Sequence, residues 1–266
     1  MNLIKFYCVT DKKINFINHK NFNFGWVGKT KAPDNYINCN HRENIFYKEK
    51  NYSELTFHYW YWKNLIINQN DEEWIGFCQK RRYWIKENIH TDFKINQNNV
   101  NAYLLTHIEN SAKFESIICK PIRVNNVKKI KLLKRGFKNL IKRPNIFFNK
   151  KIQNIELHFD MHHGYGNLKK AIELIDYDDR SDFLEYVKDN TSFNPNIMFI
   201  SKKKIIDKWF KVLFEWLNRC EKEFGFKNLK GYDQTRLYAY LAERYLSFWF
   251  KKYTKYKEYP WIFIDV

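Results

Sequence analysis

An aromatic segment and the apolar run that follows it constrain this chain most. Residues 52–67 carry Leu, Tyr and Trp side chains at helical spacing, which predicts a helix. Residues 73–78 form an apolar run that predicts a buried strand, and three cations follow it directly: Lys80, Arg81 and Arg82. Ligands of open α/β sheets bind beyond the carboxyl ends of the strands, so these cations predict a site for a negatively charged ligand.

Apolar patterns elsewhere predict the other elements. Further strands are expected at residues 3–10, 116–119, 155–159 and 197–200. Further helices are expected at residues 167–175, 181–187, 203–224 and 234–252. Residues 16–50 are rich in Asn and are broken by Gly and Pro, which predicts an irregular stretch. Alternating strands and helices in the first half predict an α/β sheet flanked by helices, and the second half is predicted to be rich in helices.

Composition narrows the class of protein. A chain of 266 residues can bury a core, and its 19% aromatic content predicts that Phe, Tyr and Trp fill it. The five cysteines are scattered, odd in number and never spaced as Cys-x-x-Cys, which favours a reducing compartment over a disulfide framework or a zinc ribbon. We expect no secretory leader, because residues 1–10 hold only a short apolar run that predicts a strand. We expect no membrane span, because the sequence has no apolar stretch of about 20 residues.

The formal charge of +18 is concentrated in one segment, a basic insert at about residues 120–151 that holds twelve Lys or Arg and no Asp or Glu. Apolar residues recur in it at helical spacing: Ile130, Leu133, Phe137, Leu140 and Ile141. This pattern is typical of a basic amphipathic helix that lies on anionic lipid. Two alternatives stay open, a helix whose apolar stripe packs on the domain and a basic surface that binds nucleic acid. The lipid surface is the partner that we expect.

Several catalytic signatures are absent from the sequence. It has no phosphate-binding P-loop, no dinucleotide-binding glycine motif and no nucleophile elbow. The polar residues after the strand expected at 155–159 offer a general base, with Asp160, His162 and His163 as candidates, although a surface or capping role fits the histidines equally well. Glu54 is an alternative base or a ligand of a sugar hydroxyl, although a buried ion pair with Arg81 or Arg82 fits it equally well. The acidic run 176–179 follows a helix, so loop material is a better interpretation than a site for Mg²⁺ or Mn²⁺.

Two segments resemble a known family. They are Tyr52-Ser53-Glu54-Leu55-Thr56 with Tyr59-Trp60-x-Trp62-Lys63-Asn64, and Trp74-Ile75-Gly76-Phe77-Cys78-Gln79-Lys80-Arg81-Arg82-Tyr83. Together they are similar to the bacterial polysaccharide glycosyltransferase family filed as domain of unknown function 4422. The same order continues through Glu43-Asn44-Ile45, His162-His163 with Leu168, Asn196 to Ile200, and Arg236 with Glu243 to Leu246. The pattern departs from the family at Gln79 and Lys80, where His and Tyr are usual, and at Glu73-Trp74, where Asp-Tyr is usual.

This resemblance implies a glycosyltransferase with a GT-A-like open mixed sheet, in a single domain over residues 1–266. Such an enzyme would move a sugar, of galactose type from a UDP donor, onto a surface polysaccharide such as capsule or lipopolysaccharide, or onto a lipid-linked glycan, with inversion. The residues implied for the donor are Val9, Thr10, Gly28, Asn44, Lys80, Arg81, Arg82 and Tyr83. The residues implied for the acceptor or sugar are Tyr59, Asn196, Arg236 and Glu243.

A metal normally neutralises the leaving diphosphate in this fold, but the expected strand end carries no Asp-x-Asp. We therefore name no metal ligands, leave Mn²⁺ or Mg²⁺ open as cofactors, and expect the cations at 80–82 to bear that charge. The expected location is cytoplasmic and peripheral on the inner face of the membrane. The alternative function is a non-catalytic protein that binds nucleic acid or an anionic surface.

Overall fold

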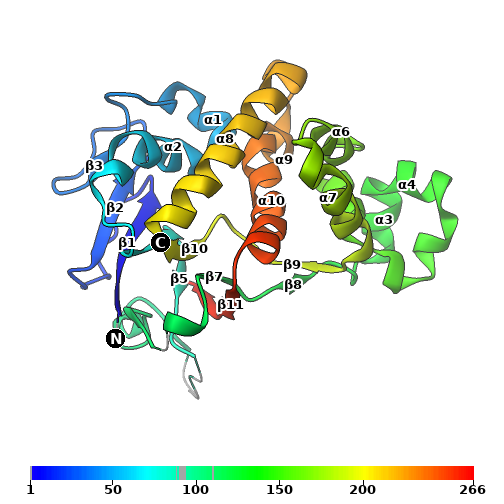
Figure 1. The fold of residues 1–266 in the computed structure, drawn as a ribbon. Coiled ribbons are helices and arrows are strands. Elements are labelled where there is room, and N and C mark those ends of the chain that lie inside the picture. The colour runs from blue at the N-terminus through cyan, green and yellow to red at the C-terminus, as the bar shows by residue number, and fades with distance from the viewer. Residues whose placement is uncertain (1, 88, 90–93, 110) are drawn as a thin grey trace. The chain divides into compact units, whose positions relative to one another are not determined.

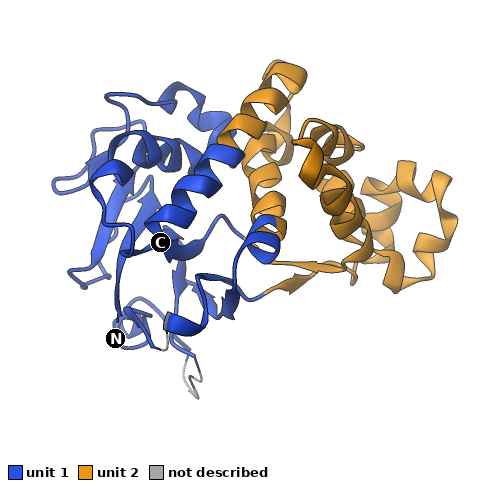
Figure 2. Cartoon of the chain, viewed as in Figure 1, with its two compact units in different colours: residues 1–120, 196–212, 249–266 blue, residues 121–195, 213–248 orange. Residues whose placement is uncertain are grey.

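The structure is a computed structural model that describes residues 2–87, 89, 94–109 and 111–266. Contacts divide the chain into two compact units (Figure 2). Unit 1 consists of residues 1–120, 196–212 and 249–266, and unit 2 of residues 121–195 and 213–248. Helices α8 (Lys203–Phe224) and α10 (Leu237–Tyr253) each run from one unit into the other. The single domain over residues 1–266 stays a prediction.

Unit 1 is built on an open mixed sheet that has ten strands among the described residues (Figure 1). Its main path runs β11 (Tyr256–Tyr259), β7 (Ser116–Cys119), β10 (Phe199–Lys202), β4 (Trp74–Gln79), β1 (Asn2–Thr10), β2 (Phe22–Trp26) and β3 (Ile37–Asn38). Strands β4, β1, β2 and β3 are parallel, whereas β10 is antiparallel to β4 and to β7. The other strands are β5 (Arg82–Trp84), β6 (His107–Ile108) and β12 (Trp261–Phe263). The predicted α/β class with an open mixed sheet flanked by helices is confirmed.

Aromatic side chains hold the helices of unit 1 against this sheet. The helical elements before β4 are η1 (Phe46–Lys48), α1 (Glu49–Tyr52), α2 (Leu55–Asn64) and η2 (Ile66–Asn68), and the short turns η3 (Val100–Ala102) and η4 (Ser111–Lys113) follow later. Tyr61 of α2 contacts Tyr7 of β1 and Phe77 of β4, with ring centroids 4.7 and 5.1 Å apart. Gly25 of β2 lies under Phe57, where an added Cβ would be 2.3 Å from the ring. The absence of a side chain at Gly25 therefore lets α2 lie close to the sheet.

Unit 2 is mostly helical. It holds α3 (Lys129–Arg135), α4 (Phe137–Lys142), α5 (Ile155–His163), α6 (Asn167–Glu173), α7 (Tyr177–Asp189) and α9 (Gly231–Thr235). Two 3-10 turns, η5 (Pro144–Phe147) and η6 (Lys150–Ile152), and the strand pair β8 (Ile122–Arg123) and β9 (Ser192–Phe193) complete it. The core is aromatic, since Phe183 of α7 contacts Trp216, Tyr245 and Phe248. The predicted helix-rich second half of the chain is confirmed.

Several predicted elements need correction. The strand expected at 155–159 is wrong, because these residues begin α5 and the Asn154 side chain caps it by accepting from the backbone N–H of Leu157 at 2.9 Å. The stretch expected to be irregular at 16–50 contains β2, β3 and η1. The helix expected at 52–67 is interrupted at Ser53, whose φ is 53°. The basic helix is interrupted at Gly136, and the helix expected at 234–252 is two helices that meet at Arg236.

The other predicted elements lie within a few residues of those observed. Residues 203–224 match α8 in full, and residues 116–119 match β7 in full. All five cysteines are free and buried. Among the described residues, no helix has both the length and the apolar character that crossing a membrane requires.

Candidate functional site

The carboxyl ends of three parallel strands meet at one edge of the unit 1 sheet. The N–H of Val27, just after β2, donates to the carbonyl of Thr10 at 2.9 Å, and the N–H of Lys80 donates to the carbonyl of Val9 at 3.0 Å. Val9 and Thr10 are both buried, and the Thr10 hydroxyl donates to the carbonyl of Lys12 at 2.6 Å. This edge is the position where sheets of this kind bind ligands.

Gly28 lies at the same edge, in the loop after β2. An added Cβ there would be 2.5 Å from the Trp26 ring, so any side chain would displace the indole. The indole N–H of Trp26 donates to the carbonyl of Thr30 at 2.9 Å, which fixes the ring in that place. Gly28 therefore has a packing role in this loop.

Lys80, Arg81 and Arg82, which we call the cation turn, connect β4 to β5. Lys80 forms an ion pair with Asp11, and Arg81 lies 3.7 Å from the carboxylate of Asp265. The guanidinium groups of Arg81 and Arg82 each lie 5.7 Å from the centre of the Phe263 ring. The two ion pairs are partly exposed, so each contributes little and a phosphate could replace the carboxylates.

A hydrogen-bonded chain links the cation turn to α2. Arg82 donates to Oε1 of Gln79 at 3.2 Å, and Nε2 of Gln79 donates to the carboxylate of Glu54. Glu54 is half-buried at the start of α2, and the unusual backbone at Ser53, with φ 53° and ψ −131°, turns the chain just before it. Strained backbone of this kind persists only where its surroundings hold it. The sequence predicted Glu54 and Arg82 separately, but not Gln79 as the link between them.

The other predicted residues of unit 1 make local contacts. Asn44 donates to the carbonyl of Arg42 at 2.8 Å and accepts from the N–H of Phe46 at 3.0 Å, so it shapes the turn before η1. The Tyr59 hydroxyl donates to Glu43 at 2.9 Å. Asn196 is buried with φ 68°.

Tyr83 is fully buried, and its hydroxyl donates to the carbonyl of Lys80 at 2.6 Å. Tyr83 therefore supports the cation turn from inside the sheet.

A hollow of about 560 Å³ lies in unit 2, beside the end of α5. Its lining is rich in cations and includes two of the predicted catalytic residues, Asp160 and His162. The lining residues are Lys134, Arg135, Phe137, Lys138, Asp160, Met161, His162, Gly164, Tyr165, Lys230, Gly231, Tyr232, Asp233 and Gln234. A hollow of about 600 Å³ in unit 1, between Lys86, Phe114 and Tyr259, contains none of the predicted residues. Of these two hollows, both lined by described residues, the one in unit 2 brings predicted residues together.

Asp160 and His162 differ in whether they accept or donate protons in this hollow. The two carboxylate oxygens of Asp160 accept from Asn139 at 2.7 Å and from the N–H of Gly166 at 2.9 Å, while burial raises the pKa of this carboxyl. Nδ1 of His162 lies 2.9 Å from Arg135. A guanidinium can only donate, so Nδ1 must accept and Nε2 carries the proton. Burial, with Arg135 next, lowers the pKa of His162, so the imidazole is neutral and a donor.

His163 is buried rather than open to the hollow. Its Nδ1 donates to the carbonyl of Asp233 at 2.9 Å, and its ring stacks on Tyr240 with centroids 3.8 Å apart. Burial lowers the pKa of His163 to about 3, with the positive charge of Arg244 as the next cause. This histidine is therefore neutral and serves as a link between α5, α9 and α10.

The remaining predicted residues of unit 2 are Arg236, just before α10, and Glu243, in the second turn of α10. Arg236 donates to the Tyr232 hydroxyl at 3.0 Å, and its guanidinium lies 4.6 Å from the centre of that ring. Glu243 forms an ion pair with the buried Arg244, which lies 3.7 Å over the ring of Phe193. Arg236 thus contacts Tyr232, which lines the hollow. Glu243 neutralises the charge of the buried Arg244.

No group of three or more His, Cys, Asp or Glu side chains in the described part of the chain is arranged to hold a metal ion. The acidic run 176–179 begins α7 and is not a free loop. Asp176 pairs with Arg219 at 3.0 Å, and Asp179 accepts from the Tyr245 hydroxyl at 2.8 Å. These carboxylates support the helices of unit 2, and they do not fit a site for Mg²⁺ or Mn²⁺.

The predicted residues thus divide between the two units. Unit 1 holds Val9, Thr10, Gly28, Asn44, Glu54, Tyr59, Lys80, Arg81, Arg82, Tyr83 and Asn196. Unit 2 holds Asp160, His162, His163, Arg236 and Glu243. Sequence reasoning missed Asp11, Gln79 and Phe263 in unit 1 and Arg135 in unit 2. Gln79 carried a signal, since it directly precedes the cations, but Phe263 carried none because it is far away in the sequence.

Comparisons with known proteins agree with the fold. No curated protein matches this chain in sequence. A solved structure, the WbbM bifunctional glycosyltransferase in its apo form, matches with a TM-score of 0.72 at 19% identity. The match covers 100% of this chain but 46% of that protein, so the chain spans less than half of its length. The likeness shows a shared fold. The model of the family described as domain of unknown function (DUF4422) matches residues 5–255, and the chain therefore belongs to this family.

Proposed function

We propose that this protein is a glycosyltransferase with a GT-A-like arrangement, which transfers a sugar from a nucleotide diphosphate donor to a glycan or lipid-linked glycan. The observation that carries the proposal is the cation turn at the carboxyl edge of three parallel strands, linked through Gln79 to the carboxylate of Glu54. The fold shared with a bifunctional glycosyltransferase supports it. A UDP sugar of galactose type is the donor that we propose, with surface polysaccharide as the product.

Unit 1 binds the donor in this proposal. The base and ribose lie along the carboxyl ends of β1 and β2, near Thr10 and Gly28, and the diphosphate contacts the cation turn. Arg81 and Arg82 then neutralise the charge that develops on the leaving diphosphate, because planar guanidinium groups bind phosphate oxygens in pairs. Phe263 supports both guanidinium groups at 5.7 Å.

Unit 2 binds the acceptor in the hollow beside α5. Asp160 is the base that we propose for the acceptor hydroxyl, because its carboxylate lines the hollow and burial raises its pKa toward the range useful for proton transfer. His162 donates from Nε2 to an acceptor oxygen, since Arg135 occupies Nδ1. With one proton taken from the acceptor and one displacement at the sugar, the reaction inverts the anomeric centre.

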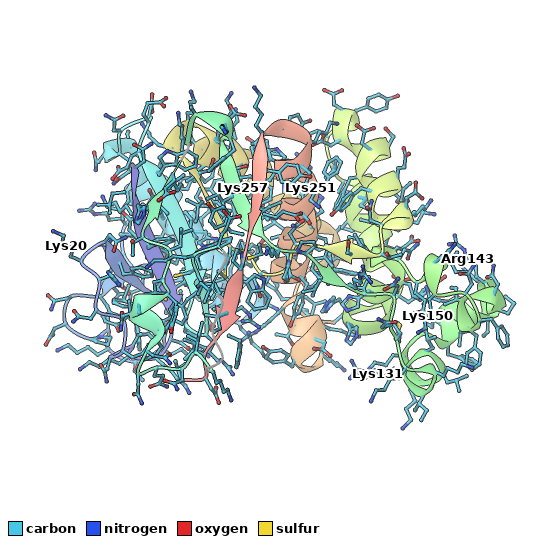
Figure 3. All side chains as sticks on the ribbon, turned by 90° about the horizontal axis from the view of Figure 1, so that it is seen from below. Lys20, Lys131, Arg143, Lys150, Lys251 and Lys257 are labelled. Carbon is cyan, nitrogen blue, oxygen red and sulfur yellow. The ribbon has the colours of Figure 1, made fainter. Side chains whose placement is uncertain are left out.

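A screen of nucleotide sugars by thermal shift, with and without Mn²⁺, tests the donor class. We expect a UDP sugar to raise the melting temperature of the wild type and Arg82→Ala to abolish the shift. Lys20→Ala is the matched control, because Lys20 is exposed in unit 1 and precedes β2, at the opposite end of the parallel strands (Figure 3). An unchanged shift in Arg82→Ala, or no response to any nucleotide sugar, contradicts the proposal.

A further inference from the structure

The basic insert presents an apolar face that nothing in unit 2 covers. Four side chains of α3 and α4 keep more than half of their surface exposed: Ile130 at 67%, Leu133 at 52%, Phe137 at 60% and Ile141 at 68%. Ile130 and Leu133 are three residues apart and share one side of α3, and Phe137 and Ile141 are four residues apart and share one side of α4. Phe148, just after η5, is 82% exposed. We call Ile130, Leu133, Phe137 and Ile141 the apolar face.

This face is not the one that fixes the helices to the unit. Leu132 and Ile146 are buried against Leu157 and Met161 of α5, and Leu140 packs against the same cluster. The helix pair therefore has one apolar side in the core of unit 2 and a second that is exposed. The sequence left open whether the apolar residues of the basic insert pack on the protein or on a lipid surface. Except for Leu140, these residues lie outside the core of unit 2. A second apolar side of this kind points to a partner.

The charged residues of the basic insert itself all have one sign, although Arg135 pairs with Asp233 outside the insert at 3.4 Å. All twelve Lys and Arg between residues 120 and 151 are exposed, and the segment contains no Asp or Glu. Figure 3 shows Lys131, Arg143 and Lys150 spread over the surface of this segment. Lys129 lies 5.0 Å from the centre of the Phe147 ring, so the cations lie directly beside apolar side chains.

We propose that α3 and α4 dock on an anionic lipid bilayer, with the apolar face in the boundary between headgroups and acyl chains and the cations on the lipid phosphates. Lipid supplies both hydrocarbon and negative charge. A nucleic-acid backbone supplies the charge but no hydrocarbon for three aliphatic side chains. The proposal does not depend on the transferase activity, because vesicle binding is measured without donor or acceptor.

The test uses the full chain and sedimentation with vesicles of phosphatidylcholine, alone or mixed with phosphatidylglycerol. We expect the wild type to bind the mixed vesicles and not the neutral ones. The apolar variant Ile130→Gln, Leu133→Gln, Ile141→Gln should bind at least about tenfold more weakly, because its hydrocarbon contact is lost. The charge variant Lys128→Gln, Lys129→Gln, Lys131→Gln should bind more weakly at low salt, and its binding should depend less steeply on salt than that of the wild type. None of these six residues lines the hollow beside α5.

Ile67→Gln is the matched control, because Ile67 is 76% exposed in unit 1, and it should bind as the wild type does. Each variant is first shown to keep the wild-type melting temperature, as expected for exposed positions. Three results would overturn the proposal: no binding of the wild type to mixed vesicles, equal binding of the apolar variant, or binding to duplex DNA in place of vesicles. The last result would assign the segment to nucleic acid.

Discussion

At the scale of single residues, Gln79 links the cation turn to Glu54 at a position where the sequence suggested a broken motif. The resemblance to the family implies His at this position in related chains, and either side chain can donate to a carboxylate through nitrogen. In this chain the donated bond goes to Glu54, while the amide oxygen accepts from Arg82 at 3.2 Å. The residue type alone predicted a break in the motif, because the partner on α2 is 25 residues away and known only from the fold.

We therefore expect Gln79→His to bind nucleotide within about threefold of the wild type, and Gln79→Leu to bind about 10 to 100-fold more weakly. The Leu variant leaves the Glu54 carboxylate and the Arg82 guanidinium half-buried without this bridge. Calorimetric titration with UDP measures the nucleotide affinity of both variants. Equal affinity of the Leu and Gln forms would show that the bridge does not position the cation turn.

His58 predicts a pH dependence of stability. It is buried on α2 among Phe77, Phe199 and Phe210, and its Nδ1 has no hydrogen-bond partner within the described residues. Burial lowers its pKa from 6.5 to about 3. The unfolded chain therefore takes up a proton that the folded chain refuses, so this stability is present above pH 6.5 and is lost as the pH falls toward 3.

The expected loss from His58 is about 1.4 kcal/mol per pH unit below 6.5. His58→Leu should remove this slope between pH 6.5 and 5 and should not lower stability at pH 7.5, because an apolar side chain of similar volume replaces an unsatisfied polar one. Urea unfolding at several pH values measures the free energy of unfolding of both proteins. A parallel pH dependence in the two proteins would contradict the assignment.

Asp160 gives a prediction for catalysis. Asp160→Asn should lower the rate of transfer by about 10² to 10⁴-fold while the thermal shift with a UDP sugar is unchanged, because the carboxylate is assigned to the acceptor hydroxyl and not to the donor. Its bonds to Asn139 and Gly166 make a structural effect possible, so the pH profile is the second measurement. The wild-type rate should fall at low pH as the carboxyl takes up a proton, and the residual rate of the Asn variant should not.

At the scale of elements, sequence patterns predicted α8 correctly and α5 wrongly. Helix α8 has a strong apolar side, and its predicted bounds match. Helix α5 buries Ile155, Leu157, Phe159 and Met161, which alternate along the sequence like a strand because both sides of the helix face neighbours. The capping Asn154 was the available signal for a helix. The wrong prediction matters for the site, because Asp160 and His162 lie on a helix and not in a loop.

The junction between α1 and α2 gives a prediction at this scale. Ser53 has a φ of 53°, in a region that favours glycine, so Ser53→Gly should stabilise the protein by about 0.5 to 1 kcal/mol. Ser53→Val should destabilise it, because a branched side chain tolerates that backbone poorly. Thermal unfolding ranks the three proteins. A Gly variant less stable than the wild type would mean that the Ser side chain, rather than the backbone, sets the junction.

At the scale of the whole molecule, the sequence predicted the α/β class and the family but not the division into two units. Strands β10, β11 and β12 are short and carry no pattern that assigns them to the sheet of the first 120 residues, although β10 lies between β4 and β7. Long-range pairing of this kind depends on the complete fold. The candidate sites divide between units for the same reason, and their grouping could not be read from spacing.

A fragment of residues 1–120 should therefore fail to fold. It would lack β10 between β4 and β7, and β11 would no longer pair with β7. We expect no cooperative thermal transition by circular dichroism, whereas the full chain should show one. A cooperative transition in the fragment would mean that β1, β2, β3 and β4 form a sufficient sheet alone.

The pairing of β12 with β5 also bears on synthesis in the cell. The two strands join Trp261 to Trp84 and Phe263 to Arg82, pairs that are 177 and 181 residues apart in the chain. A ribosome must therefore have translated residue 263, and released it from the exit tunnel, before Phe263 can cover Arg81 and Arg82. Until then the nascent chain carries the cation turn without the aromatic ring that lies beside both guanidinium groups.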